Sequence, residues 1–140
     1  MQCLYNTICA LQAFKPRSRL IMENKKKILI YDTSKGFSRF IKLNFSDRYD
    51  VTLFFDYKDF RDIRFEEYSA GFFIINESIE AFDLMLIYSK LKSLIVGSRV
   101  PIISKNLNNV DDITIIDLTK SRQEMVEFID FNLKIFAVAE

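Results

Sequence analysis

The chain has 140 residues, of which 49% are hydrophobic and 14% aromatic, and its formal net charge is +1. This length suits one domain with a full core, and the balanced charge argues against a general electrostatic role on nucleic acids or membranes. The sequence contains no histidine, which excludes the usual general base, the commonest zinc ligand and the Ser-His and Cys-His catalytic arrangements.

Residues 1–24 are expected to form an N-terminal extension, either weakly ordered or folded as a short helix, ahead of a domain at residues 25–140. Residues 5–14 are mildly apolar, but basic residues follow this stretch instead of preceding it, which is the wrong order for a secretory signal. No apolar run reaches the ~18–20 residues that span a bilayer. Cys3 and Cys9 match no metal motif and are interpreted as reduced thiols. We therefore expect a cytoplasmic protein without a membrane partner.

The first predicted strand, residues 28–31, is a short apolar run followed by Asp32. Such continuous apolar runs are typical of strands buried on both faces of a parallel sheet. The third predicted strand, residues 70–76, has the same form and ends at Asn76. Because the carboxyl ends of parallel strands meet at one edge of the sheet, Asp32 and Asn76 are expected to face each other.

Helices and further strands alternate along the rest of the chain. A helix capped by Thr33 or Ser34 is predicted after the first strand, and its apolar stripe is Phe37, Phe40, Ile41 and Phe45. The later elements, in chain order, are predicted as a second strand at residues 51–55, a weak helix at 58–67, a long helix at 79–94 that is apolar on more than one face, a fifth strand at 113–117 and a last helix at 121–136. Such alternation predicts a parallel sheet with right-handed crossovers.

The position of the fourth strand is open between two segments. We favour residues 100–104, because Pro101 fits the first position of a strand, where a missing N–H costs least. Only about eight residues then lead to the fifth strand, fewer than the ~10–12 of a usual parallel crossover, so the link would be a bare loop. The alternative is a fourth strand at residues 94–96, with the Pro101 segment in the crossover.

This ordered set resembles the receiver domain of two-component response regulators over roughly residues 26–136. The similarity is best in the strands that end at Asp32 and Asn76, in the spacing from Asn76 to Pro101, and at residues 111–129. The resemblance implies an α/β, flavodoxin-like fold with a five-stranded parallel sheet of order 2-1-3-4-5. Residues 106–112 are too few for the usual fourth helix, so we expect that helix to be shortened or missing.

The resemblance also assigns a phosphorylation site and removes most of its chemistry. Receivers hold magnesium with an acidic pair after the first strand, which here corresponds to Asp32 and Thr33. Their phosphorylated aspartate corresponds to Asn76, and their lysine after the fifth strand corresponds to Asp117. Their hydroxyl residue after the fourth strand corresponds to Ser104, with Asn106 as a competing position.

Elementary chemistry agrees with this degenerate pattern. An acyl phosphate needs a carboxylate nucleophile, which the neutral amide of Asn76 cannot supply. Magnesium prefers charged oxygen ligands, so Asp32, even with Glu77 nearby, is only a weak candidate ligand. Asp117 places negative charge where a phosphoryl group needs a cation. We expect a pseudo-receiver with weak or no Mg²⁺ binding and no other cofactor, in which Asp32 can serve as a helix N-terminal acid and Asn76 can simply close a strand.

The sequence thus favours a signalling or protein-interaction module, not an enzyme. A short fourth helix would leave apolar sheet surface uncovered beside the long apolar helix. Such an exposed apolar surface predicts a protein partner, and a second copy of the chain is one candidate. Nucleic acid is not expected, since residues 25–27 are interpreted as a solvated strand entrance. Two alternatives stay open: a small-ligand or metal binder that uses Asp32, Glu77 and Asp117 without a Gly-rich phosphate loop, and an atypical phosphorelay receiver.

Overall fold

A computed structural model describes residues 25–139, in which five parallel strands form one sheet of order β3-β2-β4-β5-β6. The strands are β2 (Lys26–Asp32), β3 (Tyr49–Phe54), β4 (Ala70–Ile75), β5 (Leu94–Ser98) and β6 (Thr114–Ile115). This is the order 2-1-3-4-5, so the flavodoxin-like fold expected from the sequence is confirmed. The extension expected at residues 1–24 lies outside the described residues.

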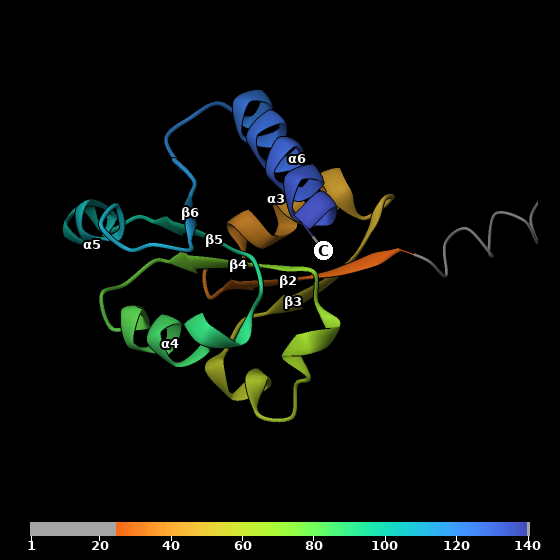
Figure 1. The fold of residues 1–140 in the computed structure, drawn as a ribbon. Helices are drawn as coiled ribbons and strands as arrows, with labels where there is room; N and C mark the ends of the chain where they lie inside the picture. The colour runs from red at the N-terminus through yellow and green to blue at the C-terminus, as the bar shows by residue number, and fades with distance from the viewer. Residues whose placement is uncertain (1–24, 140) are drawn as a thin grey trace, which may run out of the picture.

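Helices cover both faces of the sheet (Figure 1). The helices α3 (Gly36–Phe45) and α6 (Arg122–Ala139) lie on one face, whereas α4 (Glu80–Ile87) lies on the other and α5 (Pro101–Leu107) lies toward the β6 edge. Three short 3-10 turns complete the described chain: η1 (Tyr57–Phe60), η2 (Phe65–Glu67) and η3 (Tyr88–Lys90). The weak helix expected at residues 58–67 is therefore two separate 3-10 turns. None of the helices in residues 25–139 is long and apolar enough to cross a membrane.

The two central strands divide their side chains between two cores. Ile30 of β2 and Phe72 of β4 pack under α3 and α6, whereas Tyr31 and Phe73 pack under α4. The rings of Tyr31 and Phe73 stack with their centroids 4.5 Å apart. All six residues of β4 are buried, which explains why this strand is one continuous apolar run in the sequence.

The fourth strand is β5, Leu94–Ser98, so the favoured assignment of this strand to residues 100–104 is wrong. The apolar residues of β5 are buried beside β4, with Phe72 opposite Ile95 in the register. Pro101 is instead the first residue of α5, where its missing N–H needs no partner and its fixed φ suits the helix. The crossover to β6 therefore contains a helix, and the bare loop is not needed.

Two other predicted elements are shorter than expected. The fourth helix, α5, is present but has only 7 residues, so it is shortened and not missing. The long helix predicted at residues 79–94 ends at Ile87 and continues as the turn η3, because the chain must then enter β5. The fifth strand, predicted at residues 113–117, pairs only through the two residues of β6.

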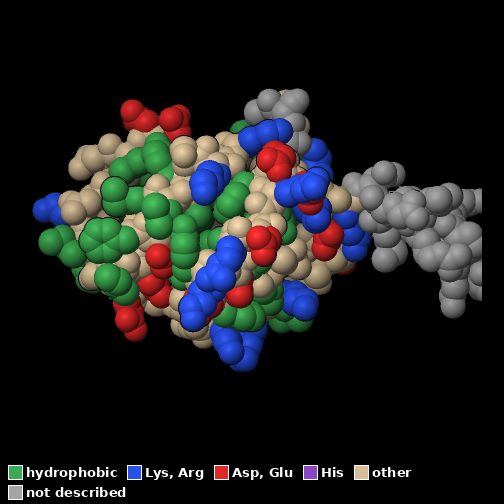
Figure 2. Space-filling view, turned by 90° about the horizontal axis from the view of Figure 1, so that it is seen from below, with side chains coloured by type: hydrophobic (Ala, Val, Ile, Leu, Met, Phe, Trp, Pro, Cys, Tyr) green, Lys and Arg blue, Asp and Glu red, His purple; other side chains and the backbone are tan. Residues whose placement is uncertain are grey.

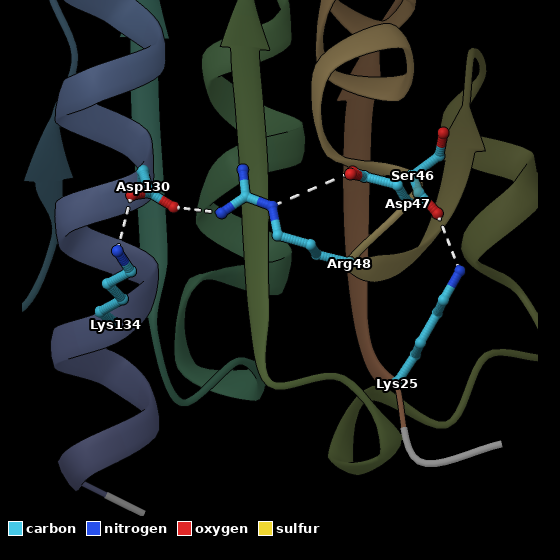
Figure 3. Close-up of polar contacts among 6 residues, drawn as sticks. All are labelled: Lys25, Ser46, Asp47, Arg48, Asp130 and Lys134. Atoms are coloured by element: carbon cyan, nitrogen blue, oxygen red, sulfur yellow. Dashed lines mark hydrogen bonds and ion pairs between the residues drawn. The ribbon is translucent and has the colours of Figure 1, made fainter. Parts of the chain in front are cut away.

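A small charged cluster ties α6 to the turn between α3 and β3 (Figure 3). Arg48 in the turn donates through Nη1 to Asp130 Oδ1 of α6 at 2.6 Å, and Lys134 Nζ lies 2.9 Å from Asp130 Oδ2. Nearby, Lys25 Nζ donates to the carbonyl oxygen of Ser46 at 3.0 Å. The hydrogen bonds from Lys134 and Arg48 hold the pKa of the Asp130 carboxyl below its ordinary value.

Replacing the fully buried Phe72 by Ala is expected to lower the free energy of unfolding by about 3–5 kcal/mol, through lost burial and the cavity left behind. Urea unfolding followed by circular dichroism measures this loss. Phe131→Ala is the matched control, because Phe131 is 64% exposed on α6 and should change stability by less than about 0.5 kcal/mol. Equal losses in the two variants would contradict the placement of Phe72 in the core.

Asp130→Asn is expected to lower stability by less than about 1 kcal/mol at neutral pH, since the ion pairs are partly exposed. Because the folded-state pKa of Asp130 is lowered, its contribution is present above the unfolded-state pKa of about 4. The contribution is lost as the pH falls through the lowered folded value. Urea unfolding across this range should show wild type and variant converging in acid, and a difference that persists below the folded value would refute this assignment.

Candidate functional site

Asp32 and Asn76 meet at the carboxyl edge of the sheet. Asp32 ends β2, Asn76 directly follows β4, and these two strands are neighbours. The side-chain amide of Asn76 donates through Nδ2 to Asp32 Oδ1 at 2.8 Å and to Thr33 Oγ1 at 3.3 Å. The structure therefore brings together three of the residues that the sequence placed in one crevice.

The carboxylate of Asp32 is fully buried and serves as the N-terminal anchor of α3. Its Oδ2 accepts the backbone N–H groups of Phe37 at 2.8 Å and Ser38 at 3.1 Å, in the first turn of the helix. Its Oδ1 accepts the N–H of Ser34 at 3.2 Å and the Ser34 hydroxyl at 2.9 Å, beside the bond from Asn76. These donors and the positive end of the helix dipole stabilise the negative charge.

This arrangement corrects the expected helix cap. The residue at the N-cap position is Lys35, in the left-handed conformation with φ of 70°, and its side chain makes no capping hydrogen bond. Neither Thr33 nor Ser34 caps the helix. Asp32, several residues earlier, reaches over the turn instead, and it has the role of helix N-terminal acid that the sequence allowed it.

A second buried carboxylate, Glu80 at the start of α4, completes the site and was missed from the sequence. Glu80 is 7% exposed, and its Oε1 accepts the backbone N–H groups of Asn76 at 2.6 Å and Glu77 at 3.2 Å. Its Oε2 accepts the hydroxyl of Thr33 at 2.5 Å. A glutamate three residues after Glu77 at a helix start is the spacing in which a side chain reaches back to a free N–H, and that signal could have indicated Glu80.

Arg99, in the loop after β5, holds the other end of the Asn76 side chain and was also missed. Its Nε donates to Asn76 Oδ1 at 3.0 Å, and its backbone N–H donates to the carbonyl oxygen of Ile75 at 2.8 Å. Both ends of the Asn76 amide are therefore engaged. We name the strand-end network by its five members: Asp32, Thr33, Asn76, Glu80 and Arg99.

The corrected fourth strand ends at Ser98 and not at Ser104, the hydroxyl residue that the sequence placed after that strand. Ser98 ends β5 and lies opposite Ile75 of β4, so it occupies the position after the fourth strand that the sequence assigned to Ser104. Ser104 lies within α5 and donates its hydroxyl to the carbonyl oxygens of Ser98 at 3.1 Å and Val100 at 3.2 Å. The same correction applies to Asn106, the competing position, which is the next-to-last residue of α5.

The remaining acids lie outside the strand-end network. Glu77 is exposed, and its carboxylate makes no hydrogen bond or ion pair within residues 25–139. Asp117 is also exposed, and it accepts hydrogen bonds from the N–H and hydroxyl of Thr119, which lower its pKa. Asp117 shares an open hollow of about 640 Å³ with Ser98, Arg99 and Ser104.

The hydrogen bonds of Asp32 bear on whether it can bind a metal ion, for which the sequence made it a weak candidate. Its two oxygens already accept hydrogen bonds from α3, Ser34 and Asn76, so a cation there would have to displace some of these donors. Among residues 25–139, no three side chains of the types His, Cys, Asp or Glu lie close enough together to hold a metal ion. Weak Mg²⁺ binding stays a prediction.

The network also generates a stability prediction. Asp32→Asn is expected to lower the free energy of unfolding by about 1–3 kcal/mol, because an amide nitrogen would then face N–H donors of α3 or Asn76. Amide hydrogen exchange at Phe37 and Ser38 should become faster. Asp62→Asn is the control, since Asp62 is exposed and makes no ion pair in the described part of the chain. Unchanged exchange at both amides would contradict the anchoring role of Asp32.

No protein-family model matches the chain, and no curated protein matches it either. Among solved structures, the chain is similar to the signal receiver domain of a protein described as a Luxo repressor, from Vibrio parahaemolyticus. The identity is 14%, the TM-score is 0.58, and the match covers 82% of this chain and 95% of that one. The likeness establishes a receiver-like fold and leaves the chemistry to be argued from the residues of this chain.

Proposed function

We propose that this chain is a pseudo-receiver that is not phosphorylated and that acts as a signalling or protein-interaction module. The observation that carries the proposal is the strand-end network. The resemblance assigns the phosphoacceptor position to Asn76, an amide, and the network engages both ends of that amide. The proposal includes a cytoplasmic location and no enzymatic activity.

No residue of the site is arranged to accept a phosphoryl group. The amide of Asn76 is not a nucleophile for acyl phosphate formation, which requires a carboxylate. The carboxylate of Asp32 is fully buried, and it could attack a phosphoryl donor only after losing its hydrogen bonds from the start of α3. Glu80 is almost as buried, and its two oxygens accept bonds from Asn76, Glu77 and Thr33.

The basic side chain beside Asn76, that of Arg99, has a different role from the lysine of receivers. Asp117, at the position of that lysine, is exposed and bonded to Thr119. Arg99 supplies the positive charge beside Asn76 instead, and it comes from the loop between β5 and α5. Its two hydrogen bonds hold this loop to the end of β4 without any phosphate. This supports a module with one permanent conformation at its carboxyl edge.

The alternative of a small-ligand binder would use the hollow that Ser98, Arg99, Ser104 and Asp117 line. The polar groups of this hollow are largely engaged within the protein. Ser98 and Ser104 bond to backbone groups of the same loop, and Asp117 bonds to Thr119. A ligand would have to compete with these bonds, so this alternative has less support than an interaction module.

Wild-type protein is expected to show no chemical-shift change when beryllofluoride or acetyl phosphate is added with Mg²⁺, as measured by ¹H–¹⁵N NMR spectroscopy, because position 76 carries an amide and not a carboxylate. Asn76→Asp combined with Thr33→Asp should restore Mg²⁺-dependent shifts at the ends of β2 and β4, since three carboxylates attract a divalent cation. A matched control is Asn109→Asp with Ser89→Asp, which adds the same charge at exposed positions outside the network and outside the hollow that Arg99 lines.

An acid-labile phosphoryl group on wild-type Asp32 or Glu77, detected by mass spectrometry, would refute the proposal. Saturable shifts of wild-type resonances around the strand-end network with beryllofluoride would also refute it. Restored Mg²⁺ shifts in the control variant would show that added charge alone accounts for binding.

A further inference from the structure

The outer surface of α4 carries apolar side chains that no described part of the chain covers. Ile79 is 65% exposed, Phe82 64%, Met85 73% and Leu86 55%. Ile102, on the neighbouring helix α5, is 67% exposed. Figure 2, which views the molecule from the α4 side, shows hydrophobic side chains gathered toward the end where α4 and α5 lie. We name these five residues the apolar crest.

A groove of about 400 Å³ runs beside the apolar crest, between α4 and α5. Ile75 at the end of β4 lies at its floor, Ala81 and Met85 of α4 line one wall, and Ile103 and Leu107 of α5 line the other. A hydrogen bond from the Tyr88 hydroxyl to the carbonyl oxygen of Asp111, 2.8 Å long, connects the two walls at one end. The lining is almost wholly apolar, which is unusual for a surface left to water.

The shortness of α5 explains why the groove is open. The helix ends at Leu107 after 7 residues, and the chain then reaches β6 through a turn-rich loop. Beyond Leu107, only Val110 and Ile113 of this loop line the groove. The groove and the apolar crest are thus neighbouring parts of one face.

We propose that this face is a contact between two copies of the chain related by a two-fold axis, with the apolar crest of each copy in the groove of the other. The inference rests on the proposed function as an interaction module. A two-fold contact requires a surface that is complementary to itself. Here a convex apolar row and a concave apolar groove lie side by side, and Met85 belongs to both.

A single peptide helix is a poorer occupant than a second copy. It would cover the walls of the groove, but Phe82 and Leu86 do not line the groove and would stay exposed. A second copy would cover the groove and the apolar crest together, because the crest of each copy would lie in the groove of the other. The depletion of charge along the groove lining is also typical of the core of a homodimer interface.

The charges at the rim of this face permit the same pairing. Glu77, just before α4, and Lys105 of α5 are exposed, and neither side chain makes a hydrogen bond or ion pair within residues 25–139. When α4 of one copy lies against α5 of the other, each copy offers one acid and one base to its partner. Such opposite charges favour the matched orientation over alternatives.

Sedimentation velocity of the full chain over a concentration series tests the proposal. Wild type is expected to be dimeric, and Met85→Glu should raise the dimer dissociation constant by on the order of 30-fold or more, as for a residue central to an interface. Val138→Glu is the matched control, since Val138 is 88% exposed on α6, on the opposite face of the sheet, and its substitution should leave the dimer intact.

Circular dichroism must show that Met85→Glu is folded, and Phe82→Glu serves as a second variant if it is not. A wild-type protein that stays monomeric at the highest concentration would overturn the two-fold contact, as would equal dissociation of the α4 and α6 variants. Recovery of a different protein on the groove by a monomeric chain would also overturn it while preserving the proposed function as an interaction module. Failure of the pseudo-receiver proposal is separate, because it would appear in the phosphorylation experiment and not in the sedimentation data.

Discussion

A buried carboxylate balanced by helix N–H groups governs the carboxyl edge of this sheet. Asp32 is fully buried and accepts hydrogen bonds from the first turn of α3 and from Asn76. An ion buried without such partners would carry a penalty of several kcal/mol, so the contacts constrain the neighbouring elements. The end of β2, the start of α3 and the end of β4 are held in one arrangement. Asp32 is therefore part of the framework of the fold, whatever the site binds.

The amide of Asn76 makes this arrangement stable without a cation. Thr33 and Asn76 bridge two buried carboxylates, those of Asp32 and Glu80. A third carboxylate at position 76 would add like charge to this pair, and without a bound cation its ionised form would be disfavoured. An amide instead donates to Asp32 and accepts from Arg99. In the proposed pseudo-receiver, the amide at position 76 thus both replaces the nucleophile and avoids this like-charge repulsion.

The sequence predicts the fold well because buried parallel strands, such as β4, are continuous apolar runs. It predicts the pairing of Asp32 with Asn76 because the carboxyl ends of parallel strands lie at one edge of the sheet. It fails where two short apolar segments compete. Residues 94–98 and 100–104 are both apolar, and Pro101 suits a strand start as well as a helix start. That error displaced the hydroxyl position from Ser98 to Ser104. The spacing of Glu80 from Glu77 signals only its local bonds to backbone N–H groups, whereas its bond to Thr33 joins residues 47 positions apart, which no local pattern reveals.

The strand-end network also sets the position of the apolar face. α4 begins at Glu80, whose carboxylate is bonded to the backbone of Asn76 and to Thr33, and α5 follows the loop that Arg99 ties to the end of β4. The two walls of the groove are therefore anchored to the same cluster of residues. A ligand shifts a conformational equilibrium only when it binds two states with different affinities. Within residues 25–139, the bonds that hold the two walls of the groove form inside the chain and require no ligand, which supports the proposed contact as a constitutive one.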